Sequence, residues 1–232
     1  MTSWTDPIAA FDLETTGIDV RSAKIVSASL VRLDASGAVV AQRDWLVDPG
    51  EPIPERATAV HGITTVRVQA DGVPARLAVP EIVAAVREVL GAGIGLVVYN
   101  APYDLSLLAW EARRYGVPEI DRLAPIIDPI IVDKQVDRYR KGKRTLELTA
   151  AHYGVALEGA HDAAVDAIAS ARVAQAIGRR YAQQLPSTAM ELHSAQVEWA
   201  AAQQADFAAY MRRQVDPEWV SDRPAWPGGR EA

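Results

Sequence analysis

The sequence predicts an α/β protein with a mixed sheet of five strands, helices on both faces of the sheet, and a C-terminal helical extension. The order of elements carries this prediction, because three strand patterns come first, helix and strand patterns then alternate, and helices follow alone. A hairpin requires antiparallel neighbours, whereas strand–helix–strand crossovers produce parallel ones. Hydrophobic residues make up 49% and charged residues 23% of the 232 residues, which is typical of a soluble globular protein.

The five strands are expected where short apolar runs are bounded by turn residues. They are Ile8–Asp12, Ile25–Leu33, Val39–Val47, Gly95–Tyr99 and Ala124–Ile127. The turn signal Asp34–Gly37 joins the second and third strands as a hairpin. The segment Asp48–Pro54 contains three prolines, which prevent a regular ladder, so we expect a loop there.

Helices are expected where apolar residues recur at a spacing of three or four. They are Pro80–Leu90, Tyr103–Tyr115, Ile130–Arg138, Leu146–Tyr153, Ala163–Tyr181 and Ala189–Gln214. A boundary is expected near Leu185–Ser187, so that residues 1–185 form one domain and residues 186–232 form a helical arm and an extended tail. Exposed tryptophans are unfavourable, so Trp199, Trp219 and Trp226 are expected to pack against the domain, a partner or a second copy.

Charge and composition exclude several classes of protein. The net charge of −6 argues against bulk electrostatic binding of nucleic acid, although local patches can still bind phosphates. The absence of cysteine excludes disulfides and thiolate metal sites. No apolar run approaches the roughly 20 residues that span a bilayer, and the first residues carry no signal-peptide pattern. We therefore expect a cytoplasmic protein without a membrane partner.

The first chemical motif is the pair Asp12 and Glu14 at the end of the first strand. Residues two apart on a strand point to the same face. Two carboxylates beside a core are costly unless a cation neutralises them, and oxygen-only ligands favour Mg²⁺ or Mn²⁺ over zinc. The alternative is a solvated strand end without any ligand.

Two further motifs carry acids. Asp104 follows a strand, Asn100 and a proline-containing turn, and either belongs to a site or stabilises the start of its helix. His161 and Asp166 are five residues apart and would differ by about 140° on one helix. They can share a site only if His161 lies in a loop that folds back and Asp162 caps the helix.

In this order, the three motifs resemble those of the DEDDh group of 3′–5′ exonucleases, the DnaQ-like family of the bacterial DNA polymerase III epsilon (proofreading) subunit. The resemblance covers about Pro7–Tyr181 and implies a ribonuclease H-like fold. The segments Val60–Thr64 and Arg138–Leu148 are also similar to family segments, whereas the chain beyond Tyr181 matches no family motif.

The resemblance implies a role for each motif residue. Asp12, Glu14 and Asp166 would bind the first of two divalent ions, Mg²⁺ or Mn²⁺, and Asp12 would bridge to the second. Asp104 would be the fourth acid of the metal site, and His161 would be the general base. With two such ions bound, attack of a water molecule on the last phosphodiester would release a nucleoside 5′-monophosphate. The implied substrate is the 3′ end of DNA, preferentially single-stranded or frayed, in proofreading or repair.

Substrate contacts are expected on both sides of this site. The resemblance places Thr15, Thr16, Gly17, His61 and Asn100 near the terminal nucleotide. The segment Arg138–Arg144 is rich in basic residues and is called the basic run. It predicts phosphate contacts by Arg140, Lys141 and Lys143. Each of these expectations has an alternative. The threonines would instead hydrogen-bond within a turn. His61 would have a structural role, and the basic run would be a solvated face.

Other functions and partners stay open at this level. The nearest alternatives are an RNA exonuclease or oligoribonuclease of the same family, which would differ in its treatment of the 2′-OH, and a nucleic-acid-binding module with a vestigial site. Beyond the DNA or RNA 3′ end, the C-terminal arm could bind a polymerase or another protein, or form a homodimer.

Overall fold

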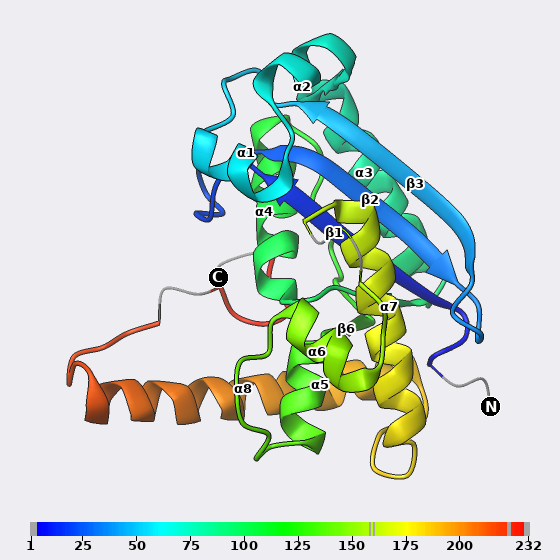
Figure 1. Cartoon of the computed structure of the whole chain (residues 1–232), viewed down its shortest axis with the longest axis vertical. Helices are drawn as coiled ribbons and strands as arrows, with labels where there is room; N and C mark the ends of the chain where they lie inside the picture. The colour runs from blue at the N-terminus through cyan, green and yellow to red at the C-terminus, as the bar shows by residue number, and fades with distance from the viewer. Residues whose placement is uncertain (1–3, 158, 160, 222–223, 230–232) are drawn as a thin grey trace.

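The computed structural model describes residues 4–157, 159, 161–221 and 224–229. In this part of the chain six strands form one mixed sheet in the order β4-β3-β2-β1-β5-β6 (Figure 1). The strands are β1 (Ile8–Thr15), β2 (Ile25–Leu33), β3 (Val39–Asp48), β4 (Val73–Pro74), β5 (Gly95–Val97) and β6 (Ile126–Ile127). The predicted α/β fold is confirmed, and the expected hairpin is the antiparallel pair β2–β3.

The helices surround this sheet. They are α1 (Glu55–His61), α2 (Thr65–Asp71), α3 (Ala75–Gly91), α4 (Ala101–Arg114), α5 (Pro129–Val136), α6 (Leu146–Tyr153), α7 (Ala163–Arg180) and α8 (Ala189–Gln214). α6 and α8 begin and end at the predicted residues, and α3 includes Pro80 in its interior rather than at its start.

Three elements were not expected from the sequence. β4 has two residues, which pair with Val47 and Asp48 of β3 and make a sixth strand where five were predicted. This strand is too short to show a periodic pattern. The helices α1 and α2 have seven residues each, directly after the proline-rich loop. Prolines signal a break in the pattern, and here Pro54 occupies the N-cap position of α1.

The alternation of β1 separates two helical layers. Phe11 and Leu13 belong to one buried cluster, which includes residues of α3 and α4. Ile8 and Ala10 belong to the other, which includes residues of α5 and α7. Figure 1 shows α3 and α4 on one side of the sheet and α7 on the other. The sheet therefore has helices on both faces, as predicted.

Parallel pairing brings two motifs to the same edge of the sheet. β1 pairs with β5 in parallel, with Ala10 opposite Val97, and β5 pairs with β6 in parallel. Because parallel strands end at the same edge, the acids at the end of β1 lie beside the turn that follows β5 and starts α4.

The C-terminal arm and tail pack against the rest of the chain. α8 packs on α5 and β6, and the tail returns to α4, where the N–H of Gly229 donates to the Ser106 hydroxyl at 3.0 Å (Figure 1). Trp199 and Trp226 are partly buried in the two clusters, and Trp219 packs edge-on against Phe207 at 5.5 Å. The expected packing is confirmed for Trp199 and Trp226, whereas Trp219 packs on a residue of the arm itself. None of the helices described is both long and apolar enough to cross a membrane.

Candidate active site

The first pair of acids lies on the α7 side of β1. The intervening Leu13 points into the core beneath α3 and α4, so Asp12 and Glu14 point the other way. Glu14 is 8% exposed and Asp12 is partly buried. The β1–β2 register shifts between Glu14 and Thr15, and such a bulge bends the strand just past the second acid.

The third acid comes from the start of α4. Asp104 lies in the first turn of this helix and is buried. Its Oδ1 accepts a hydrogen bond of 3.1 Å from the N–H of Leu13 on β1. The helix begins after Asn100, whose φ of 63° is left-handed. The side chain of Asp104 thus connects the first turn of α4 to the strand that carries Asp12.

In the third motif, His161 and Asp166 are brought together by a loop that folds back before the capped start of α7. Asp162 is the N-cap of α7 and accepts hydrogen bonds from the N–H groups of Ala164 and Val165. His161 precedes it with a φ of 69°, and its backbone N–H donates to Oδ2 of Asp166 at 3.1 Å. The predicted cap and the folded-back loop are confirmed.

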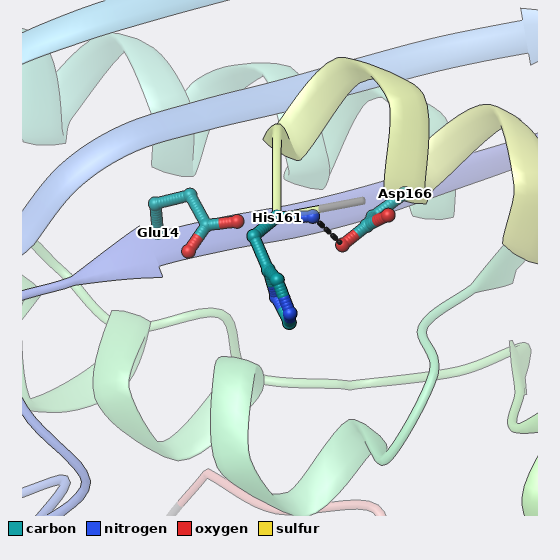
Figure 2. Close-up of side chains that lie close together, drawn as sticks. All are labelled: Glu14, His161 and Asp166. Carbon is teal, nitrogen blue, oxygen red and sulfur yellow. Dashed lines mark hydrogen bonds between the residues drawn. The ribbon is translucent and has the colours of Figure 1, made fainter. Parts of the chain in front are cut away.

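The first and third motifs meet at one point. Glu14, His161 and Asp166 each offer a ligand atom, and these atoms all lie within 4.8 Å of one another. Figure 2 shows Glu14 on β1 facing the start of α7, with the hydrogen bond from His161 to Asp166 beside it. Three residues from opposite ends of the domain sequence thus form one cluster.

Burial and repulsion by neighbouring carboxylates raise the pKa of all four acids. Burial is the largest cause for each, and it raises the pKa of Glu14 from 4.5 to about 7 with a further contribution from Asp166. The pKa of Asp12 is raised well above its usual value by burial and then by the charges of Asp104, Asp166 and Glu14. The pKa of Asp104 and that of Asp166 are also raised. The cluster is therefore unfavourable as a set of carboxylates alone.

The cluster fits a divalent cation. No lysine or arginine among the described residues forms an ion pair with the four acids. Oδ1 of Asp166 is buried without a hydrogen-bond partner in the described structure, although a buried carboxylate oxygen normally has one. Carboxylate donors suit Mg²⁺ or Mn²⁺. Asp12, Glu14, Asp104 and Asp166 are the residues that would hold such ions.

His161 is the solvent-exposed member of the cluster. Its side chain is half exposed, and its Nε2 lies 3.8 Å from Oε1 of Glu147 on α6. The sequence interpretation did not single out Glu147, because an acid on an exposed helix face carries no local signal. The structure places this carboxylate beside the imidazole of His161.

A turn held by Tyr103 follows the acids of β1. The Thr15 hydroxyl donates to the carbonyl of Gly17 at 2.9 Å and lies 2.6 Å from the Tyr103 hydroxyl, which also hydrogen-bonds that carbonyl. The Thr16 hydroxyl accepts from the N–H of Lys24 at 2.9 Å. The hydroxyls of both threonines therefore form hydrogen bonds with other residues of the chain, which was the alternative to substrate contact. Thr15 is still partly exposed beside Glu14. Tyr103 was missed, although it directly precedes Asp104.

The basic run divides into inward and outward side chains. Arg140 and Arg144 both bind Oδ2 of the buried Asp133, each at 2.6 Å. This geometry favours a structural role for Arg140. Lys141 and Lys143 are exposed and stay the candidates for phosphate contact. Tyr139 of the same segment is 89% exposed and does not lie in the core.

His61 and Asn100 are the two remaining residues expected to contact the substrate. Nδ1 of His61 accepts from the N–H of Ile63 at 3.1 Å, and burial lowers the pKa of His61. Its ring lines a pocket of about 240 Å³ that His161 and Arg67 also line. Asn100 is exposed, and its backbone N–H is held by Asp128, a buried acid that was not expected. The position of Asp128 after an apolar strand was the signal that could have identified it.

Comparison with known proteins identifies the family of the chain. The RNase_T family model, described as exonuclease, matches residues 9–174. The DNA polymerase III subunit epsilon-like protein of Rhodobacter capsulatus is 33% identical over 168 residues, which cover 69% of this chain and 22% of that protein. A PolC-type DNA polymerase III of Pediococcus pentosaceus is 31% identical over 156 residues, or 67% of this chain and 10% of that protein. The chain thus spans only a small part of the length of these relatives.

Solved structures share the fold at low sequence identity. A structure of exonuclease I has a TM-score of 0.66 at 16% identity and covers 77% of this chain and 42% of that chain. Exonuclease X in complex with 5′ overhanging duplex DNA has a TM-score of 0.57 at 20% identity and covers 80% of this chain and 98% of that chain. The family model, the relatives and the fold agree. The chain therefore belongs to the exonuclease family of DnaQ-like nucleases, a class of hydrolases, on a ribonuclease H-like fold.

Proposed function

We propose that the chain is a metal-dependent exonuclease that removes nucleoside 5′-monophosphates from the 3′ end of DNA, with a preference for single-stranded or frayed ends. The observation that carries this proposal is the convergence of four acids, none paired with a lysine or arginine in the described residues, beside the half-exposed His161. The substrate class is supported by the relatives, which are named as DNA polymerase III proteins, and by exonuclease I of E. coli, solved with a dA16 oligonucleotide.

The side chains divide the work of hydrolysis. Two divalent ions held by the four carboxylates would activate the attacking water and stabilise the leaving oxygen. The neutral imidazole of His161 accepts the proton of the water, and the nearby Glu147 carboxylate stabilises the imidazolium that results. Asp166 accepts a hydrogen bond from the backbone N–H of His161 and so fixes the position of His161 beside the cluster. Lys141 and Lys143 contact phosphates of the strand.

The test is a ladder assay on oligonucleotides labelled at the 5′ end. The products should shorten by one nucleotide at a time from the 3′ end, with Mg²⁺ or Mn²⁺ and not in EDTA. A blocked 3′ terminus should stop the reaction, whereas a blocked 5′ terminus should not. Undiminished hydrolysis after thorough chelation would contradict the metal-dependent mechanism.

The same assay separates the alternatives. RNA of the same sequence tests the oligoribonuclease alternative, because only a requirement for the 2′-OH would favour it. A vestigial binding module would bind DNA without hydrolysis and would show no metal binding in calorimetry.

A role in proofreading or repair needs a partner. We propose that the exposed part of α8, which carries Phe207 and Tyr210, is where a polymerase would bind. Light scattering of the chain alone and with a polymerase distinguishes this association from a homodimer.

A further inference from the structure

The outer edge of the sheet is completed by side chains of α8 instead of a strand. β6 is the edge strand, and an edge strand leaves backbone groups unpaired. Here the N–H of Ile126 donates to Nδ1 of His193 at 3.1 Å, and the carbonyl of Ile126 accepts from Nε2 of Gln196 at 3.1 Å. The N–H of Asp128 then donates to Oε1 of Gln196 at 2.7 Å. Gln196 is fully buried and takes the place of a neighbouring strand.

The next link runs from β6 to the turn before α4. The Asp128 carboxylate is buried and accepts from the N–H groups of Asn100 at 3.2 Å and Ala101 at 3.1 Å. The left-handed φ of Asn100 is uncommon for a residue other than glycine and persists only where surrounding contacts hold it. Ala101 is the first residue of α4, so Asp128 fixes where this helix starts.

The last link is the helix itself. Asp104 lies in the first turn of α4, and its Oδ1 accepts from the N–H of Leu13 at 3.1 Å. A shift of the helix start would move this carboxylate relative to Asp12 and Glu14. Sites of this kind depend on the groups that orient their ligands, which are needed nearly as much as the ligands.

We propose that Gln196 is a positioning residue for Asp104, acting through Asp128 and the backbone of Asn100 and Ala101. Gln196 lies beyond residues 9–174, the part that the exonuclease family model matches. The arm would therefore be part of the catalytic scaffold of this protein. The inference rests on the proposed function, because it assumes that Asp104 helps to hold the metal ions.

The test compares two glutamines of the same helix in the whole 232-residue chain. Gln196→Met keeps the length of the side chain and removes its hydrogen bonds. Gln203→Met is the matched control, because Nε2 of Gln203 donates to the carbonyl of Ile131 at 3.0 Å, and no hydrogen bond joins it to Asp128. The measurements are Mn²⁺ affinity by calorimetry, kcat and KM on a single-stranded oligonucleotide, and hydrogen exchange of the Asn100 and Ala101 amides.

The expected result is a loss confined to the Gln196 variant. Mn²⁺ affinity and kcat should each fall by about 10- to 100-fold, the usual effect of removing a group that orients a metal ligand, while KM stays within about twofold. The Asn100 and Ala101 amides should exchange faster in Gln196→Met and at the wild-type rate in Gln203→Met. Wild-type affinity, kcat and exchange in Gln196→Met would overturn the inference, as would equal losses in both variants.

Two further variants keep the test decisive. If Gln196→Met does not fold, Asp128→Asn tests the same connection, because a carboxamide has one acceptor oxygen where the carboxylate has two. Unchanged Mn²⁺ affinity and unchanged amide exchange in that variant would overturn the inference. Asp104→Asn separates the inference from the proposed function. If Asp104→Asn binds Mn²⁺ and turns over normally, the proposed site is wrong. If it is inactive while Gln196→Met behaves as wild type, only the inference fails.

Discussion

Replacing Glu14 by glutamine should stabilise the metal-free protein at high pH. Burial and neighbouring charges raise the pKa of Glu14 from 4.5 to about 7, so the folded state holds a proton that the unfolded state has lost between these values. Stability therefore falls as the pH rises through this window. At about 1.36 kcal/mol per pKa unit, the full penalty above pH 7 is about 3 kcal/mol. Glu14→Gln removes the ionisable group and with it this penalty.

The assay is urea unfolding in EDTA at pH 5 and pH 8. The variant should be more stable than wild type by up to about 3 kcal/mol at pH 8 and by much less at pH 5. Glu88→Gln is the control, because the Glu88 side chain is 77% exposed on α3 and its loss should have little effect at either pH.

Added Mn²⁺ should reverse the order. Wild type should gain stability by binding the ion, whereas Glu14→Gln should gain less, because it lacks one of the carboxylates. Equal stability of the two proteins at pH 8 in EDTA would refute the electrostatic reasoning. A gain of the same size at both pH values would also refute it, because it would trace the effect to packing and not to charge.

Four further variants separate the roles of neighbouring residues. Asp166→Ala should abolish turnover, whereas Asp162→Ala should cost about 1 kcal/mol of stability as a lost helix cap and leave much of the activity, as shown by urea unfolding and the ladder assay. The reverse pattern would mean that the acid of the third motif is misassigned. Replacing both Lys141 and Lys143 by glutamine should raise KM and reduce its salt dependence. In log–log titrations of KM against salt, the slope should be lower by about 0.7 for each lost phosphate contact. An unchanged slope would mean that these lysines form only a solvated face. His161→Ala should lower kcat by roughly 10²–10⁴-fold and remove the rise of kcat with pH, because only a neutral imidazole accepts a proton, while calorimetry should show nearly unchanged Mn²⁺ binding. An active variant with an unshifted pH profile would exclude His161 as the base.

Two helices were predicted to the residue. α6 has eight residues and α8 has 26, and each follows a threonine whose side chain accepts a hydrogen bond from a backbone N–H of the first turn. β4 was missed, because its pairing with β3 depends on residues distant in the sequence and leaves no local period.

The site was predictable where spacing alone fixes geometry. Asp12 and Glu14 share a face because they are two apart on a strand, and Asp162 caps α7 because it precedes an apolar helix. The direction of Arg140 was not predictable, because it depends on the buried Asp133 that attracts it. A charge run in the sequence does not show which of its members has a buried counter-ion.

A change of one residue in the length of β1 would invert the site. An insertion between Ile8 and Phe11 would turn both acids into the layer beneath α3 and α4 and bring Phe11 toward α7. An insertion of two residues would keep the face but move the acids by about 6.6 Å, two residue rises along the strand, away from Asp104 on α4. The strand thus acts as a fixed spacer, and changes in chain length during evolution or engineering have to fall in the connections between elements.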